Sequence, residues 1–308
     1  ISKKPKVLLG MSGGVDSSTA ALLLQKEGYE VIGATMQLHD YCNNDQVEDA
    51  KEVAQRLDIK HHVFNMKEQF KKYVIDYFIE EYQVGRTPNP CVACNKYIKF
   101  GAMVDKAEEL GIEYIATGHY ARIEKVTDGD QVEYLLKKGK DESKDQSYML
   151  YNLTQELLAK TIFPLGEYSK EEVRKIAEEN GFTIANKPDS QEVCFVPDNN
   201  HFRFIQENSI TPMKKGEIVN TSGEVLGYHE GSAKYTIGQR KGLGISAKTP
   251  LFVIDIDSEK NQVVLGSNDE LFSKELIATN LNWITFEKLE KEMEVEAKIR
   301  YKAKESKA

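Results

Sequence analysis

The stretch GMSGGVDSS at residues 10–18 decides the fold of this 308-residue chain. It follows the apolar run KVLL at residues 6–9 and opens a segment, residues 19–27, with few helix breakers. A strand that turns through glycines into a helix presents free N–H groups and the positive end of the helix dipole, which together bind anions. We expect Gly13 and Gly14 to reach positive φ and to admit a phosphate, with the hydroxyls of Ser12, Ser17 and Ser18 as further donors.

Asp16 lies inside this anion-attracting loop and would repel a bare phosphate. A carboxylate is useful there if Mg²⁺ bridges it to the phosphates of a nucleotide. The simpler interpretation is a glycine-rich turn with a Ser or Asp helix cap. The whole string, placed between a strand and a helix, favours the phosphate loop instead, and the lack of a following Gly-Lys-Ser/Thr excludes the kinase-type loop.

Length and composition limit the class of protein. A chain of 308 residues predicts two or three domains. No apolar run approaches the roughly 20 residues of a membrane span, and the start has no signal-peptide pattern, so we expect a cytoplasmic protein without a membrane partner. The first residue is Ile1 and not Met, which suggests a trimmed N-terminus.

Charge and cysteine usage narrow the chemistry. The net charge of −8 excludes a surface that is basic throughout, but it allows a local basic face. Four cysteines are too few for a disulfide scaffold at this length and indicate metal or redox chemistry. They are Cys42, Cys91, Cys94 and Cys194.

Strand-like and helix-like patterns alternate through the first half of the chain. Residues 29–36, 61–64 and 114–117 read as strands. Apolar residues at helical spacing predict helices over 47–57 and 70–78, and a further helix to about residue 110 follows a Pro-containing loop at 85–94. This alternation predicts an α/β fold, a parallel sheet with helices on both faces, with the ligand at the carboxyl ends of the strands where the loop lies.

The sequence pattern changes in the second half of the chain. Ser169 and Glu172 form a capping-box pattern for a helix that ends near Asn180. Short β-prone segments at 216–219, 251–254 and 262–265 then predict a small β-rich central domain. A last domain begins near residue 276 and holds one or two strands, too few to close a barrel, so we expect an incomplete C-terminal β-barrel, truncated or disordered. The expected domains are 1–206, 207–270 and 271–308.

Further motifs carry a resemblance that spans essentially the whole chain. They are PNPCVACNK at 88–96 with IKF at 98–100, TGHYAR at 117–122, KDQSY at 144–148, DSQEVCF at 189–195 and YTIGQRKGLG at 235–244. With the GMSGGVDSS loop, and in this order, they resemble the tRNA-specific 2-thiouridylases, a family of the ATP-pyrophosphatase (PP-loop) superfamily.

The resemblance implies an enzyme that uses ATP and Mg²⁺ to adenylate the C2 oxygen of the wobble uridine in tRNA, and then replaces that oxygen with sulfur. It also implies a protein that donates persulfide sulfur, such as a cysteine desulfurase or a sulfur-relay protein. The chemistry is sound, because a uracil C2 oxygen is a poor leaving group until it is adenylated, and a cysteine persulfide is a strong, soft nucleophile.

Positions that match the family motifs supply the site residues. The resemblance makes Cys194 the persulfide-bearing cysteine and Cys94 the partner that resolves it through a disulfide. The ATP-binding positions are Gly10, Met11, Ser12, Gly13, Gly14, Val15, Asp16, Ser17, Met36 and Gly118. The tRNA-binding positions are Asn89, Pro90, Cys91, His119, Lys144, Asp145, Gln146, Arg300 and Tyr301.

The chain departs from the family at Cys91, where the better-known pattern is Asp-x-x-Cys. Cys-x-x-Cys with a distant third cysteine is also a metal-site spacing. Related tRNA thiolases hold an iron–sulfur cluster on three cysteines, so Cys91, Cys94 and Cys194 are possible cluster ligands. A Cys91–Cys94 disulfide or a zinc site is the non-catalytic alternative, and we favour the persulfide route because the rest of the chain follows the thiouridylases.

Two other classes of function share some of these features. An ATP-pyrophosphatase ligase that acts on a small molecule needs the loop but no thiols. A tRNA- or metal-binding protein without catalysis is the other alternative. At the level of single residues, the ordinary interpretations are a surface imidazole for His119 and solvated side chains for the lysines. For an RNA-modifying enzyme, we expect one RNA-facing surface that includes Lys96, Lys99, Lys144, Arg240 and Lys241.

Overall fold

The computed structural model describes residues 4–39, 44–183 and 193–308, so Cys42 and the 189–192 part of the Cys194 motif lie outside it. The chain divides into two compact units. The first contains residues 1–70, 91–190 and 281–308, and the second contains residues 71–90 and 191–280. These units group residues by contact, so the expected three-domain division stays a prediction. Among the described residues, no helix is both long and apolar enough to cross a membrane.

The first unit is built on a five-stranded parallel sheet with the order β3-β2-β1-β4-β7. Its strands are β1 (Lys6–Gly10), β2 (Glu30–Gln37), β3 (Lys60–Asn65), β4 (Tyr114–Ala116) and β7 (Thr161–Ile162). The chain moves from β1 outward to β3 and then returns to the other side of β1. The order therefore reverses between β1 and β4, and the predicted loop follows β1 at this switch point, where such sheets bind ligands.

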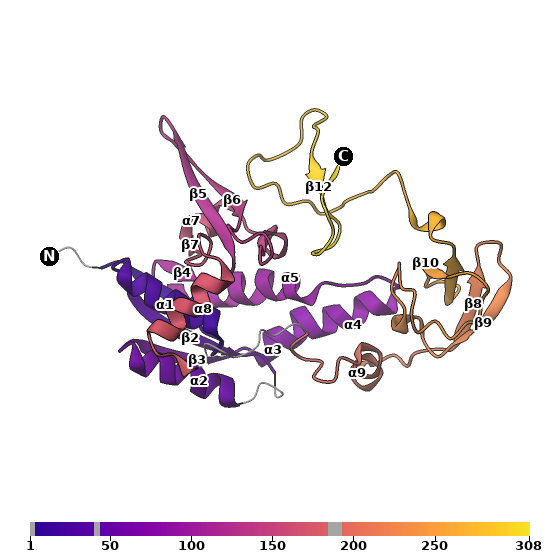
Figure 1. Cartoon of the computed structure of the whole chain (residues 1–308), viewed down its shortest axis with the longest axis horizontal. Coiled ribbons are helices and arrows are strands. Elements are labelled where there is room, and N and C mark those ends of the chain that lie inside the picture. Colours follow the sequence, from indigo (N-terminus) through magenta and orange to yellow (C-terminus); the bar gives the residue numbers. More distant parts are fainter. Residues whose placement is uncertain (1–3, 40–43, 184–192) are drawn as a thin grey trace. The chain divides into compact units, whose positions relative to one another are not determined.

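Helices cover both faces of this sheet, as predicted (Figure 1). Val7 and Leu9 of β1 point into one core, which is shared with α1 (Val15–Lys26), α2 (Asn44–Arg56) and α8 (Lys170–Glu179). Leu8, between them, enters the opposite core with α6 (Met103–Glu109) and α7 (Gln155–Lys160). The period of two along β1 explains why this short apolar run serves two cores.

One element of this unit was not predicted from the sequence, and the bounds of a loop differ from those predicted. The antiparallel hairpin of β5 (Ala121–Asp128) and β6 (Gln131–Lys138) extends from the sheet without having been predicted (Figure 1). The expected loop over 85–94 is wrong at its end, because α5 (Pro90–Cys94) is helical. Proline at the first helical position is favoured, since its fixed φ suits a helix and its missing N–H has no partner there anyway.

The first unit also holds several short elements. They are α3 (Lys67–Phe70), the π-helical η2 (Asn95–Ala102), the 3₁₀ turn η3 (Ser147–Leu150), and the two-stranded pair β12 (Glu296–Ala297) and β13 (Ser306–Lys307). The last pair agrees with the one or two strands expected near the C-terminus.

The second unit contains a four-stranded sheet with the order β10-β11-β8-β9. Its elements are η1 (Lys71–Ile75), α4 (Asp76–Gln83), α9 (His201–Asn208), β8 (Gly216–Asn220), β9 (Val225–His229), η5 (Ser232–Lys234), β10 (Phe252–Asp257), β11 (Gln262–Gly266) and η6 (Asp269–Leu271). The expected β-rich segments are confirmed. Phe78 of α4 packs its ring 5.3 Å from Phe195, which ties this early helix to the later chain.

Candidate nucleotide and thiol site

The anion loop has the predicted strand-turn-helix form, but its two glycines differ. Gly13 has φ +70°, and a methyl group there would lie 2.6 Å from the Gln46 carbonyl oxygen of α2. Gly14 has φ −94° and ψ 163°, an extended conformation, so the prediction of positive φ is wrong for it. The reason is that Gly14 is the N-cap of α1, a position that normally has β-region backbone angles.

The loop serines act mainly within the protein. The hydroxyls of Ser17 and Ser18 donate to the Gly14 carbonyl at 3.2 and 2.9 Å, and Ser17 Oγ also accepts the Ser12 N–H at 3.2 Å. Ser18 has no exposed surface, so its expected role as a phosphate donor is wrong. Ser12 is exposed at the loop. The first amides of α1, which have no acceptor inside the helix, remain the main donors for an anion.

Asp16 is held by two side chains from far along the chain. Lys170 Nζ lies 2.8 Å from both carboxylate oxygens, and the Tyr120 hydroxyl donates to one of them at 2.7 Å. The Lys170 side chain is 10% exposed and that of Asp16 is 32% exposed. Lys170 is therefore largely shielded from water, whereas part of the Asp16 side chain faces solvent beside the loop.

This donor set suits a magnesium ion that arrives on a nucleotide better than one bound by the protein alone. The part of the chain that the structure describes holds no cluster of three or more His, Cys, Asp or Glu side chains able to bind a metal. Mg²⁺ commonly needs only one or two protein carboxylates besides substrate phosphates. Asp16 is the carboxylate that the loop itself offers.

Lys170 is fixed by its own backbone surroundings. It is the first residue of α8, directly after Ser169, which forms the predicted capping box with Glu172. Its N–H donates to Asp141 at 3.0 Å, and hydrogen bonds from Ser143 and from this N–H lower the pKa of the Asp141 carboxyl. The hydrogen-bonded N-terminus of α8 thus positions the Lys170 ammonium group beside the loop.

Two residues expected to contact tRNA bind the protein's own backbone. Gln146 Oε1 accepts the Tyr120 N–H at 2.9 Å, and the Gln146 N–H donates to the Tyr120 carbonyl at 2.8 Å. Asp145 is buried and accepts from the Gly139 and Ser147 N–H groups at 2.9 and 3.2 Å. This segment therefore positions Tyr120 and, through its hydroxyl, the loop carboxylate. Its tRNA contact stays a prediction.

Other expected nucleotide positions gather at the same edge of the sheet. A methyl group on Gly10 would lie 3.7 Å from Met36 Cε, at the end of β2. A methyl group on Gly118, just after β4, would lie 3.1 Å from the Ser17 nitrogen. The ends of β1, β2 and β4 thus bring these residues together, as the parallel topology requires.

His119 is buried, so the surface-imidazole alternative is wrong. It is 7% exposed, its Nδ1 lies 2.7 Å from Thr117 Oγ1, and its ring packs 6.0 Å from those of Phe100 and Phe163. Burial, and secondarily Lys99, place the pKa of His119 well below its usual value, so the ring is neutral at pH 7. Its tRNA contact stays a prediction.

The Cys-x-x-Cys pair lies on α5, with Cys91 exposed, Cys94 buried and no disulfide between them. Burial raises the pKa of Cys94, which the neighbouring Lys99 opposes and Cys91 supports. The structure therefore holds Cys94 as the neutral thiol near pH 7, and it becomes a nucleophile only as the thiolate.

The remaining expected residues are divided between the units. Cys194 is exposed and belongs to the second unit, which also contains the exposed Arg240 and Lys241. Arg300 is exposed and Tyr301 half-buried in the first unit. The single RNA-facing surface, the Cys94–Cys194 partnership and the cluster alternative therefore stay predictions.

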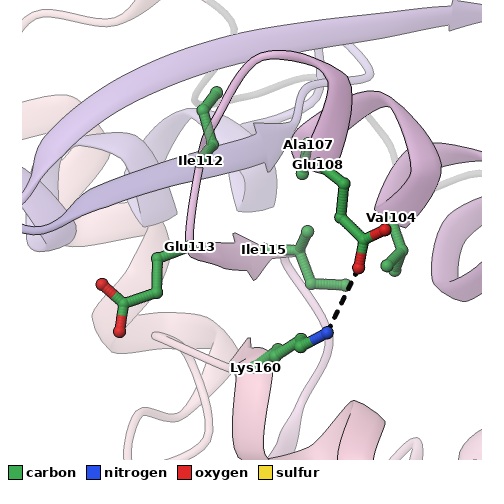
Figure 2. Close-up of a pocket in the computed structure, with 7 residues that line it drawn as sticks. All are labelled: Val104, Ala107, Glu108, Ile112, Glu113, Ile115 and Lys160. Carbon is green, nitrogen blue, oxygen red and sulfur yellow. Dashed lines mark hydrogen bonds and ion pairs between the residues drawn. The ribbon is translucent and has the colours of Figure 1, made fainter.

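A hollow of about 230 Å³ lies elsewhere on the first unit (Figure 2). Its lining includes Ile115 and the ion pair of 3.2 Å between Lys160 and Glu108. Ile112 and Glu113, which precede β4, also line it, and none of the expected site residues does.

Lys170 and Tyr120 were not predicted as partners of Asp16, because no motif indicates that their side chains contact it. The capping box predicts where α8 begins, but it carries no signal that the first residue of that helix reaches a loop 154 positions earlier.

Fold and loop together define an α/β nucleotide-binding enzyme domain joined to a small β-rich domain. A family model described as "tRNA methyl transferase HUP domain" matches residues 5–198, and one described as "tRNA methyl transferase PRC-barrel domain" matches residues 203–267. The tRNA-specific 2-thiouridylase MnmA 2 of Caldanaerobacter subterraneus subsp. tengcongensis is 53% identical, covering 100% of this chain and 87% of its own. That of Caldicellulosiruptor saccharolyticus is 54% identical, covering 99% and 87%.

The chain belongs to the tRNA-specific 2-thiouridylase family. Among solved structures, a 4-thiouridine synthetase–RNA complex with bound ATP is similar at 20% identity and a TM-score of 0.40, covering 60% of this chain and 43% of that one.

Proposed function

We propose that this enzyme thiolates C2 of the wobble uridine of tRNA, using ATP for activation and a cysteine persulfide as the sulfur source. The observation that carries the proposal is the loop carrying Asp16 at the switch point of a parallel sheet, in a chain that is 53% identical over its whole length to a tRNA-specific 2-thiouridylase. Thiolation fits better than the methyl transfer in the family description, because methyl transfer needs neither a triphosphate loop nor thiols.

In the first step, the uridine C2 oxygen attacks the α-phosphorus of ATP and pyrophosphate leaves. The amides at the start of α1 hold the departing phosphates, and the nearby Lys170 ammonium favours the charge that develops on them. Mg²⁺ bound to the nucleotide would neutralise further phosphate charge and would meet the protein at Asp16.

In the second step, the terminal sulfur of a Cys194 persulfide attacks the adenylated C2, and AMP leaves with the oxygen. The Cys94 thiolate then attacks the Cys194 sulfur, releasing 2-thiouridine and leaving a Cys94–Cys194 disulfide, which an external thiol must reduce. Cys194 is exposed, which suits loading by a donor protein such as a cysteine desulfurase. The raised pKa of Cys94 slows unwanted reactions of the resolving thiol.

Tyr301, one of the residues expected to bind RNA, lies beside a cation that was not predicted. Lys298 Nζ lies 5.7 Å from the ring centre of Tyr148 and 6.0 Å from that of Tyr301. Cations beside aromatic faces offer both phosphate pairing and base stacking to single-stranded RNA. A tRNA partner and a cytoplasmic location are part of this proposal.

Reconstituted thiolation tests the proposal directly. Unmodified tRNA, MgATP and a persulfide donor are combined, and thiolated tRNA is measured by mercury-gel retardation together with release of AMP and pyrophosphate. We expect Cys94→Ser and Cys194→Ser to abolish thiolation. AMP formation without thiolation by the parent enzyme would refute the proposal.

Cys91→Ser separates the persulfide route from the cluster alternative. A persulfide route leaves this variant with most of its activity in air. An inactive, colourless variant beside an active, iron-loaded parent, both prepared anaerobically, would instead establish a cluster on the three cysteines.

A further inference from the structure

One side-chain hydroxyl links the anion loop to two strands of the sheet. Thr35, near the end of β2, is 5% exposed, and its Oγ1 donates to the Met11 carbonyl at 2.8 Å. The same oxygen lies 2.9 Å from Nε2 of His61 on β3. Met11 is the first residue after β1, where the loop begins.

The donor and acceptor roles in this chain of contacts are determined. A hydroxyl has one proton, and a carbonyl can only accept, so the Thr35 proton points to Met11. The Thr35 oxygen must then accept from the Nε2–H of His61. Burial, followed by the charge of Lys51 and the nearby His62, lowers the pKa of His61 and so favours the neutral ring. The hydrogen bond to Thr35 then requires the single ring proton to be on Nε2.

The surroundings leave the start of the loop little freedom. The Met11 N–H donates to the Ala34 carbonyl at 2.7 Å, so both polar groups of Met11 are tied to β2. A methyl group on Gly33 would lie 2.7 Å from Met11 Sδ and 2.9 Å from His61 Cδ2, so these groups pack directly over the strand. Two residues on, Gly13 abuts α2. The loop is therefore braced by β2 on one side and α2 on the other.

We propose that Thr35, oriented by His61, is a positioning residue of the nucleotide site. By holding the Met11 carbonyl against β2, it sets the peptide planes that follow, so that the loop and the first amides of α1 face a common point. The effect is preorganisation for phosphate, because the amides need not reorient when the ligand binds. This inference rests on the proposed function only in taking ATP as the ligand of the loop.

Replacement of Thr35 by its isostere tests the inference. Thr35→Val keeps the shape and removes the hydroxyl, whereas Thr35→Ser keeps the hydroxyl. Thr161→Val is the matched control, since Thr161 is also a buried threonine of this sheet whose hydroxyl donates to a backbone carbonyl, that of Leu157 at 2.6 Å. The full chain is titrated calorimetrically with MgATP, and its melting temperature and tRNA affinity are measured in parallel.

We expect Thr35→Val to weaken MgATP binding by about tenfold, the size expected when one buried hydrogen bond is lost. Thr35→Ser and Thr161→Val should stay within about twofold of the parent, and tRNA affinity should not change. A merely structural role would lower the melting temperature in both valine variants alike and would leave their MgATP affinities equal. That equality would overturn the inference.

The same titrations distinguish this inference from the proposed function. If the parent enzyme binds MgATP and the affinities of Thr35→Val and Thr161→Val are equal, the positioning role alone is refuted. If the parent enzyme binds no MgATP, both the positioning role and the proposed function are refuted. Should Thr35→Val fail to fold, Thr35→Ala is compared with Thr161→Ala, and equal MgATP affinities would again refute the role.

Discussion

The ion pair of Asp16 and Lys170 gives the sharpest quantitative prediction. Lys170→Met removes the ammonium group but keeps most of the apolar stem, and it leaves a carboxylate with one partner fewer in the wall of the loop. Two unit charges about 4 Å apart attract by about 4 kcal/mol at the effective dielectric constant of a protein surface. Desolvation of a lysine side chain that is only 10% exposed offsets much of this, and the 32% exposure of Asp16 adds screening by water.

We therefore expect a net coupling of about 1 to 2 kcal/mol between the two side chains, below the 3 to 5 kcal/mol lost when a fully buried pair is broken. The assay is a double-mutant cycle of Lys170→Met, Asp16→Asn and the double variant. Unfolding by denaturant is followed through Trp283, the single tryptophan of the chain, which belongs to the first unit.

Lys175 and Glu179 on the same helix supply the control cycle. Their pair is 3.9 Å long, with side chains that are 74% and 62% exposed, so we expect a coupling of only a few tenths of a kcal/mol. A coupling between Asp16 and Lys170 no larger than that of this surface pair would refute the reasoning.

Three further outcomes follow from the geometry. Gly13→Ala should weaken MgATP binding more than tenfold, because φ +70° and a distance of only 2.6 Å to the Gln46 carbonyl oxygen oppose a methyl group. Gly14→Ala should change MgATP binding less than about twofold. Equal effects of the two substitutions would contradict the loop geometry. Since the folded-state pKa of His119 is lowered, the melting temperature should fall as the pH drops below about 6.5, the histidine pKa in the unfolded chain. His119→Asn should flatten this pH dependence. An unchanged slope in the variant would argue against a lowered pKa of His119. Iodoacetamide should label Cys91 at pH 7.5 and Cys94 only well above pH 8.5, as read by peptide mass spectrometry, because burial raises the pKa of Cys94; early labelling of Cys94 would disprove the buried thiol.

Local patterns allowed much of the fold to be predicted. The apolar run at residues 6–9 indicates a buried strand, and the spacing of Val47, Ala50 and Val53 indicates the buried face of a helix, since these patterns depend only on neighbours along the chain. The start of α8 was equally accessible, because a capping box is made by residues three positions apart. The hairpin β5–β6 was not, since its strands are largely exposed and carry many charged residues.

By itself, the sequence determined that a glycine-containing loop joins a strand of a parallel sheet to a helix, and its motifs pointed to the family. Only the tertiary structure decided that Lys170 forms an ion pair with Asp16 and that Gln146 accepts a hydrogen bond from the Tyr120 backbone. It also decided that Thr35 donates a hydrogen bond to the Met11 carbonyl. These contacts join residues that lie 24 to 154 positions apart. Such pairs are set by the order of strands and the packing of helices, and a hydrogen bond requires a heavy-atom distance near 3 Å that no periodicity along the chain can specify.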